Sequence, residues 1–243
     1  SNNGEVSHFQ ALATAMSGTV GNGNIAGVAI AIAIGGPGAT FWMILCGILG
    51  MSSKFVECTL GVKYREIGSD GTVYGGPMYY LKKGLTEIGY EKLGKILGIT
   101  FAILCIGASF GGGNAAQSNQ AAMQLVNYFG MSGGSARTII GIIMMIVVGI
   151  IIIGGIKRIA SVTEKIVPFM AGIYVLACLY IIISNFTFID DAFGLIFSQA
   201  FSPTAGVGGF IGVLIQGFRR GAFSNEAGSG AASVSYTHLR AHE

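Results

Sequence analysis

Long apolar stretches alternate with short polar connections along the chain. Five stretches contain no Asp, Glu, Lys or Arg: 6–53, 96–136, 138–156, 166–189 and 192–218. A helix needs about 20 residues to cross roughly 30 Å of hydrocarbon, so the longest stretch must be divided at a turn signal, Gly35-Gly36-Pro37-Gly38. The pattern predicts six membrane-spanning helices, at about 8–34, 39–62, 96–128, 138–156, 161–184 and 205–234.

The composition supports a membrane location. Charged residues make up 10% of the chain, against about 25% in an ordinary soluble domain. So few charges cannot cover the surface of a soluble enzyme or a nucleic-acid-binding protein. We therefore expect an all-α integral membrane protein in which 1–234 form a single transmembrane domain. The polar residues 235–243 break the hydrophobic pattern and are predicted to be a non-native tail.

Basic residues are concentrated in alternate connections between the predicted spans. The connection at 63–95 carries six and the one at 157–165 carries three, whereas the other connections together carry only Arg137. Cytoplasmic loops are enriched in Lys and Arg, so this asymmetry predicts a cytoplasmic start of the chain. The segment 190–201, which opens with Asp190-Asp191, is predicted to lie along the membrane surface.

Two of the predicted spans are poorly suited to a continuous helix. The first contains Ser17-Gly18-Thr19-Val20-Gly21-Asn22-Gly23-Asn24, and the sixth contains glycines and polar residues from Gln216 to Gly230. Each Gly costs up to about 1 kcal/mol in a helix interior. Non-helical backbone at membrane depth persists only inside protein or beside a water-filled cavity. The alternative is close helix packing through small residues, which explains the glycines but not the neighbouring Asn, Thr and Ser.

The interval between the two interruptions suggests a repeat. Five spans separate their starting points, and an odd number would insert a second copy upside down relative to the first. Inverted repeats with interrupted first helices are typical of secondary transporters. Exposed amide N–H groups at a half-helix N-terminus suit a carboxylate, and freed carbonyl oxygens suit a cation such as Na⁺.

Seven motifs resemble one family in their order along the chain, from about residue 8 to 230. They are GTVGNGNIAGVA at 18–29, GGPGA at 35–39, FWM at 41–43, KYRE at 63–66, GGPMYY at 75–80, GNAAQSN at 113–119 and RGAFSNEAG at 220–228. Together they resemble the alanine or glycine:cation symporter family, also called the sodium:alanine symporter family.

The resemblance implies a leucine-transporter-type five-plus-five inverted-repeat fold, here the first repeat plus the first helix of the second. It implies an integral protein of a prokaryotic plasma (inner) membrane that carries alanine, glycine or a similar small neutral amino acid with Na⁺, or with H⁺. A passive amino-acid channel or facilitator is the alternative. Family members have an extra N-terminal hydrophobic segment and four or more later spans, so we expect a fragment that does not transport by itself.

The candidate substrate site combines residues from both interruptions. The backbone amides of Val20, Gly21, Asn22, Gly23 and Asn24 are candidates for the substrate carboxylate, with the side chains of Thr19 and Asn24 closing the site. The resemblance adds Gln117, with Asn114 beside it, from the third span, and Phe223, Ser224 and Asn225 from the sixth. The carbonyls from Gly18 to Asn22 are candidates for part of a cation site.

Charged residues at membrane depth are functional candidates because they are costly there. Arg219, Arg220 and Glu226 are assigned either a gating role or a structural ion pair. Lys54 and Glu57 are interpreted as side chains that reach the membrane surface from the end of the second span. We expect no enzyme activity, since no catalytic pair is visible, and no cofactor, metal site or nucleic-acid partner. The oligomeric state is left open.

Overall fold

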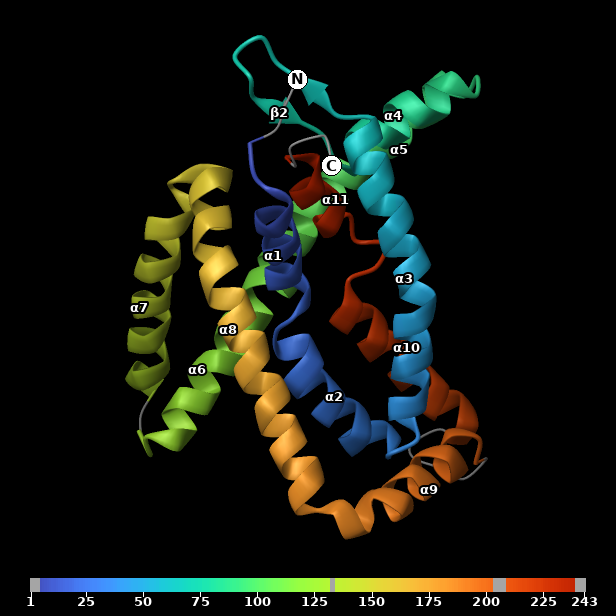
Figure 1. The fold of residues 1–243 in the computed structure, drawn as a ribbon, viewed down its shortest axis with the longest axis vertical. Helices are drawn as coiled ribbons and strands as arrows, with labels where there is room; N and C mark the ends of the chain where they lie inside the picture. The colour runs from blue at the N-terminus through green and yellow to red at the C-terminus, as the bar shows by residue number, and fades with distance from the viewer. Residues whose placement is uncertain (1–4, 132–133, 203–208, 239–243) are drawn as a thin grey trace. The chain divides into compact units, whose positions relative to one another are not determined.

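The structure is a computed structural model that describes residues 5–131, 134–202 and 209–238. It is all-helical apart from a short hairpin, as predicted (Figure 1). Five helical stretches are long and apolar enough to cross a membrane, and all were found among the described residues. They are His8–Gly35, Ala39–Lys63, Glu91–Tyr128, Ser135–Ile152 and Gly155–Ser184.

These five stretches overlap the first five predicted spans. The predicted sixth span, 205–234, contains two shorter helices, α10 (Gly209–Asn225) and α11 (Ala231–Thr237). Its first residues, 205–208, lie outside the described part of the chain. The sixth crossing therefore stays a prediction.

The chain forms two compact units. Unit 1 comprises Ser1–Gly18, Glu57–Glu164 and Gly230–Glu243, and unit 2 comprises Thr19–Val56 and Lys165–Ser229. Two of the points at which the chain passes between units lie at or next to the two interruptions, after Gly18 in the last turn of α1 and after Ser229. The other two lie inside long helices, α3 (Ala39–Lys63) and α8 (Gly155–Ser184).

Unit 1 contains most of the helices and the hairpin. Beside parts of α3 and α8, its elements are α1 (His8–Thr19), β1 (Glu66–Ile67), β2 (Val73–Tyr74), α4 (Pro77–Glu87), α5 (Glu91–Ala108), the π-helix η1 (Ser109–Ala115), α6 (Ala116–Tyr128), α7 (Gly134–Ile152) and α11. The strands pair antiparallel, with Glu66 opposite Tyr74. Helices α5, η1 and α6 follow one another without a turn between them.

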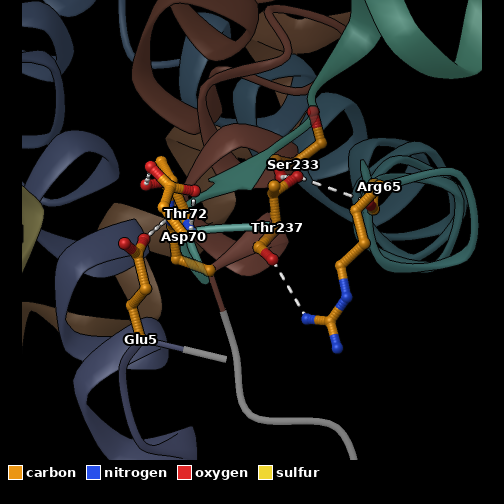
Figure 2. Close-up of polar contacts among 8 residues, drawn as sticks. Glu5, Arg65, Asp70, Thr72, Ser233 and Thr237 are labelled. Carbon is orange, nitrogen blue, oxygen red and sulfur yellow. Dashed lines mark hydrogen bonds and ion pairs between the residues drawn. The ribbon is translucent and has the colours of Figure 1, made fainter. Parts of the chain in front are cut away.

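The short helix α11 is embedded in unit 1. Its residues Ser233 and Thr237 are 0% and 1% exposed. The Thr237 hydroxyl donates to the Ser233 carbonyl at 2.8 Å, and Arg65 Nη1 donates to the Thr237 carbonyl at 3.1 Å (Figure 2). A side chain at Gly61 of α3 would lie 2.8 Å from the Ser233 carbonyl oxygen, so this helix contact requires glycine.

The end of α11 belongs to the segment 235–243 that was predicted to be a non-native tail. Within that segment, Ser235 and Thr237 are buried, with 7% and 1% of their surface exposed. Residues 239–243 lie outside the described part of the chain. The non-native origin of 235–243 therefore stays a prediction.

Unit 2 is built around close contacts of α10 with α2 and α3. It contains α2 (Asn22–Gly35), most of α3, most of α8, the 3₁₀ helix η2 (Phe186–Phe188), α9 (Ile189–Ala200) and α10. Helix α2 lies along α10 (Figure 1). Its buried residues recur every fourth position, which forms one narrow face of small side chains: Gly23, Gly27, Ala31 and Gly35.

Two glycines of α10 serve packing and do not interrupt the helix. A Cβ at Gly217 would lie 2.4 Å from the Trp42 Cβ, and one at Gly221 would lie 2.8 Å from the Cys46 Cβ. Helix α10 continues to Asn225, so the expectation that the chain is unsuited to a helix from Gln216 onward was too broad. The close-packing alternative holds for Gly217 and Gly221, and the interruption is confined to 226–230.

An aromatic cluster joins α9 to the starts of α3 and α10. Trp42 donates from Nε1 to the Ala200 carbonyl at 2.9 Å, and its ring contacts Phe41, Phe201 and Phe210 with centroids 5.1, 5.4 and 5.8 Å apart. Edge-on aromatic pairs add about 0.5–1.5 kcal/mol each beyond area burial. The cluster therefore fixes α9 at this end of unit 2.

Candidate functional site

The first interruption is short and begins the helix α2. Helix α1 ends at Thr19 and α2 begins at Asn22, so that only Val20 and Gly21 are non-helical. The Gly21 amide donates to Asn24 Oδ1 at 2.9 Å, and the Asn24 amide donates to the Gly21 carbonyl at 3.0 Å. This reciprocal pair satisfies two amides of the new helix end, as in a capping box. Two of the five amides proposed for a carboxylate are thus engaged within the chain.

The second interruption follows α10 and is rich in left-handed backbone. Glu226 has φ +51°, and Gly228 and Gly230 have φ +85° and +79°. Glu226 is the one residue other than glycine with a positive φ in the described part of the chain. A non-glycine residue in this region is strained by about 1–3 kcal/mol, a cost often found at functional sites.

The ends of the two helices at the interruptions contact each other inside unit 2. Asn24 Nδ2 donates to the Ser224 hydroxyl at 2.8 Å. A Cβ at Gly23 would lie 3.1 Å from the Ser224 Cα and 3.4 Å from the Phe223 ring. Three of the predicted substrate-site residues, Asn24, Phe223 and Ser224, are therefore brought together.

The polarity of this junction follows from helix direction. The N-terminus of α2 meets the C-terminus of α10, and their partial charges of about +0.5 and −0.5 lie at the same place. A helix N-terminus presents N–H donors and a helix C-terminus presents carbonyl acceptors. The junction can therefore offer groups of both kinds to one solute.

Two further side chains support the junction. The Tyr174 hydroxyl on α8 donates to the Asn24 carbonyl at 3.4 Å, a contact that the sequence interpretation missed. Asn225 donates from Nδ2 to the Cys46 carbonyl at 3.3 Å and accepts from the Ala227 amide at 2.9 Å. Asn225 thus connects the second interruption to α3, which positions the loop.

The remaining predicted residues lie elsewhere on these elements. Gly18 and Thr19 are the last residues of α1, where helix carbonyls run out of intrahelical partners. Gln117 lies on α6 in unit 1, directly after η1, which contains Asn114. π-Helical segments within α-helices occur frequently at functional sites. Phe223 is 44% exposed and could form a wall of the junction.

The charged residues are more buried than predicted. Lys54 Nζ is buried and has no hydrogen-bond partner in the described part of the chain, and Glu57 is 6% exposed. The interpretation of both as surface-reaching side chains is therefore wrong, because the Lys54 amine and the Glu57 side chain are buried. In unit 2, the charge of Lys54 acts on the carboxylate of Glu226. Arg219 differs from the other charged candidates because its side chain is exposed. Arg220 Nε is buried without a hydrogen-bond partner among the described residues.

The polar groups around α11 in unit 1 titrate differently from free side chains. Burial raises the pKa of Tyr80 on α4, and the charge of Glu57 raises it further. Burial lowers the pKa of Arg65. In the hairpin, hydrogen bonds from the Thr72 amide and hydroxyl lower the pKa of Asp70 (Figure 2). Burial thus governs the pKa shifts of Tyr80 and Arg65, and hydrogen bonding governs that of Asp70.

No group of His, Cys, Asp and Glu suited to a metal ion occurs within residues 5–131, 134–202 and 209–238. Five candidate spans and a paired set of helix interruptions define a multi-pass membrane protein with a candidate solute site.

Comparison with known proteins identifies the family. The family model described as "Sodium:alanine symporter family" matches residues 1–242. The chain belongs to this family, which is one of sodium-coupled amino-acid transporters and not of enzymes.

Individual relatives agree with the family match. The chain is 48% identical to a sodium/alanine symporter of Methanococcus maripaludis, over 95% of this chain and 50% of that protein. It is 44% identical to a Bacillus subtilis protein named as a probable sodium/glutamine symporter, over 93% of this chain and 45% of the relative. It is 37% identical to a sodium/proton-dependent alanine carrier protein of Bacillus sp. strain PS3, over 94% and 48%. The chain thus spans about half the length of these relatives.

Proposed function

We propose that the full-length protein containing this chain is a secondary active transporter. It carries alanine, glycine or a similar small neutral amino acid together with Na⁺ by alternating access. The observation that carries this proposal is the hydrogen bond between Asn24 and Ser224, which joins the two helix interruptions in a chain of this family. Substrate sites of such transporters form where two interrupted helices meet.

The arrangement of spans supports an inverted-repeat fold of the leucine-transporter type. Five candidate spans begin before the second interruption, which gives the odd number that inversion requires. In this fold the chain would supply the first repeat and the first helix of the second. The excess of basic residues in the connections at 63–95 and 157–165 favours a cytoplasmic start. The relatives are bacterial and archaeal, which favours a prokaryotic plasma membrane.

The chemistry of the junction favours a zwitterion of small size. Helix N–H groups suit the carboxylate, and carbonyls at a helix C-terminus suit an ammonium group or Na⁺. A Cβ at Gly23 would lie 3.1 Å from the Ser224 Cα, so the two helix ends pack closely, and we expect a solute bound between them to be small. The names of the relatives point to alanine and to glutamine, with Na⁺ or H⁺ as the coupling ion.

The test is uptake into liposomes that contain the full-length protein. Labelled alanine, glycine and glutamine are supplied with external Na⁺ or with choline, at a fixed membrane potential. We expect accumulation of alanine or glycine above the external concentration with Na⁺ only. Ion entry supplies about 2.3 kcal/mol per charge at 100 mV.

Each other outcome contradicts one part of the proposal. Uptake that only equilibrates, with or without Na⁺, would identify a passive channel or facilitator. Equal accumulation with Na⁺ and with choline would reject Na⁺ coupling, and a pH gradient would then test H⁺. Uptake of glutamine alone would reject a preference for small substrates. In the same assay Asn24→Ala, at the junction, should weaken uptake, and Asn185→Ala, at an exposed helix end outside the junction, is its matched control.

A further inference from the structure

A cavity of about 590 Å³ lies against α4 and α5 in unit 1, and no residue of either helix interruption lines it. Its volume is within the range of pockets that hold small ligands. Among its lining residues are three lysines, Lys82, Lys83 and Lys95. Apolar residues also line it, including Ile99 and Ala102 of α5.

The polar and apolar residues occupy opposite ends of the cavity. Helices α4 and α5 run antiparallel, because Gly94 approaches the carbonyls of Leu81 and Lys82 whereas Gly98 approaches Met78. The lysines therefore lie at the end near the connection between the helices, and Met78, Ile99 and Ala102 lie at the other end. Lys95 and Ala102 are seven positions apart on α5, which corresponds to about 10 Å along the helix.

The apolar end extends into a candidate membrane span. Helix α5 opens the stretch Glu91–Tyr128, which is apolar enough to cross a bilayer. Ile99 is 63% exposed, as expected of a side chain that faces lipid. The cavity thus begins among lysines at the edge of the membrane and continues along an apolar helix face.

The charge of the cavity favours an anionic ligand. Three lysines and one carboxylate, Glu66, line it. Lys83 pairs with Glu66 at 2.9 Å and Lys95 with Glu91 at 2.7 Å, but all four side chains are 36–59% exposed. Exposed ion pairs are weak and can be exchanged for another anion. Lys82 makes no direct ion pair with any described residue.

A second cavity of about 380 Å³ extends the basic end. It shares Lys82, Lys83 and Lys95 with the first and adds Thr86, Glu87 and Glu91. The carboxylates Glu87 and Glu91 would repel a large polyanion there, whereas a single phosphate can remain with the three lysines. The ligand is therefore expected to be compact at its charged end.

We propose that this cavity binds an anionic phospholipid, with the phosphate between Lys82, Lys83 and Lys95 and an acyl chain along Ile99 and Ala102. Basic pockets beside membrane helices suit such head groups. A soluble phosphate would use the lysines alone and leave the apolar end unfilled, so the combination of the two ends favours a lipid.

The test is native mass spectrometry of the protein purified in a mild detergent. Three probes are added: phosphatidylglycerol, phosphatidylcholine with the same acyl chains, and inorganic phosphate. We expect phosphatidylglycerol to bind at least ten-fold more tightly than phosphatidylcholine. We expect inorganic phosphate to compete weakly. Equal binding of the two lipids, or full displacement by inorganic phosphate at the same concentration, would overturn the proposal.

Matched variants separate the site from general attraction to a basic surface. Lys82→Gln combined with Lys83→Gln should weaken phosphatidylglycerol binding at least ten-fold, whereas Lys92→Gln, outside both cavities, should not. Ala102→Trp should fill the apolar end and weaken binding similarly, whereas Ile103→Trp should not. The double variant Lys82→Arg with Lys83→Arg keeps both positive charges and should therefore retain phosphatidylglycerol binding. Equal losses in target and control variants would overturn the proposal.

Discussion

At the scale of single residues, Asn24 is the centre of the junction between the two interruptions. Its side chain accepts a hydrogen bond from the Gly21 amide and donates one to the Ser224 hydroxyl. Its backbone carbonyl accepts a hydrogen bond from the Tyr174 hydroxyl. One residue therefore shapes the start of α2 and connects it to α10. In the proposed site, these contacts would hold the Asn24 side chain in the position from which it meets the solute.

Replacing Asn24 tests this role. Asn24→Ala removes the contact with Ser224 and the acceptor for the Gly21 amide, so substrate affinity in the full-length protein should fall ten-fold or more, about 1.4 kcal/mol. Gln117→Ala should have a similar effect if Gln117 contacts the solute. The measurement is equilibrium binding of labelled alanine, with Asn185→Ala as the control. Unchanged affinity in both variants would remove both residues from the site.

Gly23 tests how closely the two helices must approach. A methyl group at this position would lie 3.1 Å from the Ser224 Cα, and backbone cannot move aside as a flexible side chain can. Gly23→Ala should therefore destabilise the protein by about 1–3 kcal/mol, as overpacking does. Gly27→Ala, whose nearest described atom would be 3.8 Å away, is the control. Thermal unfolding in detergent measures both; equal midpoints would contradict the close approach.

At the scale of elements, α10 is a packing helix that ends in an interruption. Gly217 and Gly221 allow α3 to approach, and the chain leaves the helix only after Asn225. The left-handed residues Glu226, Gly228 and Gly230 then turn the chain toward α11. Helix α10 therefore continues through the glycines that pack against α3 and ends where the left-handed residues begin.

A matched pair of substitutions separates the two roles of glycine. Gly217→Ala would place a Cβ 2.4 Å from the Trp42 Cβ, so we expect a loss of about 1–3 kcal/mol in unfolding free energy. Gly149→Ala on α7 meets open space and should gain up to about 1 kcal/mol through helix propensity. Thermal unfolding compares the two variants. Stabilisation by Gly217→Ala would mean that Gly217 weakens the helix and does not serve packing.

The sequence predicted the elements better than their exact ends. Hydropathy located the long apolar helices, and the Asn, Thr and Ser beside the glycines indicated both interruptions. The sequence analysis made each interruption too long. A sequence does not distinguish a glycine that allows close helix packing, such as Gly217, from one that adopts a left-handed turn, such as Gly228. Only the neighbouring helix distinguishes the two.

The same limit applies to side chains. Asn24 was identified from the polar residues in the first interruption, and Ser224 from the family resemblance. Tyr174 was missed, because a tyrosine in an apolar helix gives no signal of what its hydroxyl contacts. Lys54 and Glu57 were assigned to the surface because their spacing near a helix end allows it, and their burial could not be read from that spacing.

At the scale of the whole molecule, the number of crossings fixes which groups face which side. Five candidate spans precede the second interruption, and the basic connections alternate with nearly uncharged ones. A cytoplasmic start would place the hairpin and α4 in the cytoplasm and η2 outside. This orientation would also place the proposed phospholipid cavity at the inner leaflet.

Cysteine labelling tests the orientation. In a cysteine-free full-length protein, Ser69→Cys in the hairpin should resist a membrane-impermeant maleimide added to intact cells, and Thr187→Cys in η2 should react. After permeabilisation both should react. The reverse pattern would contradict the charge asymmetry as a guide, and equal reaction in intact cells would contradict an odd number of crossings between the two positions.

The central claim is that the solute and Na⁺ bind together where α2 meets α10. The most direct measurement is the rate at which a small methanethiosulfonate reagent modifies Ser224→Cys in the cysteine-free full-length protein, with Thr187→Cys in η2 as the control position. Alanine plus Na⁺ should slow modification of Ser224→Cys at least ten-fold, alanine with choline should slow it far less, and the control should not change. Equal rates at Ser224→Cys with and without alanine and Na⁺ would contradict the account.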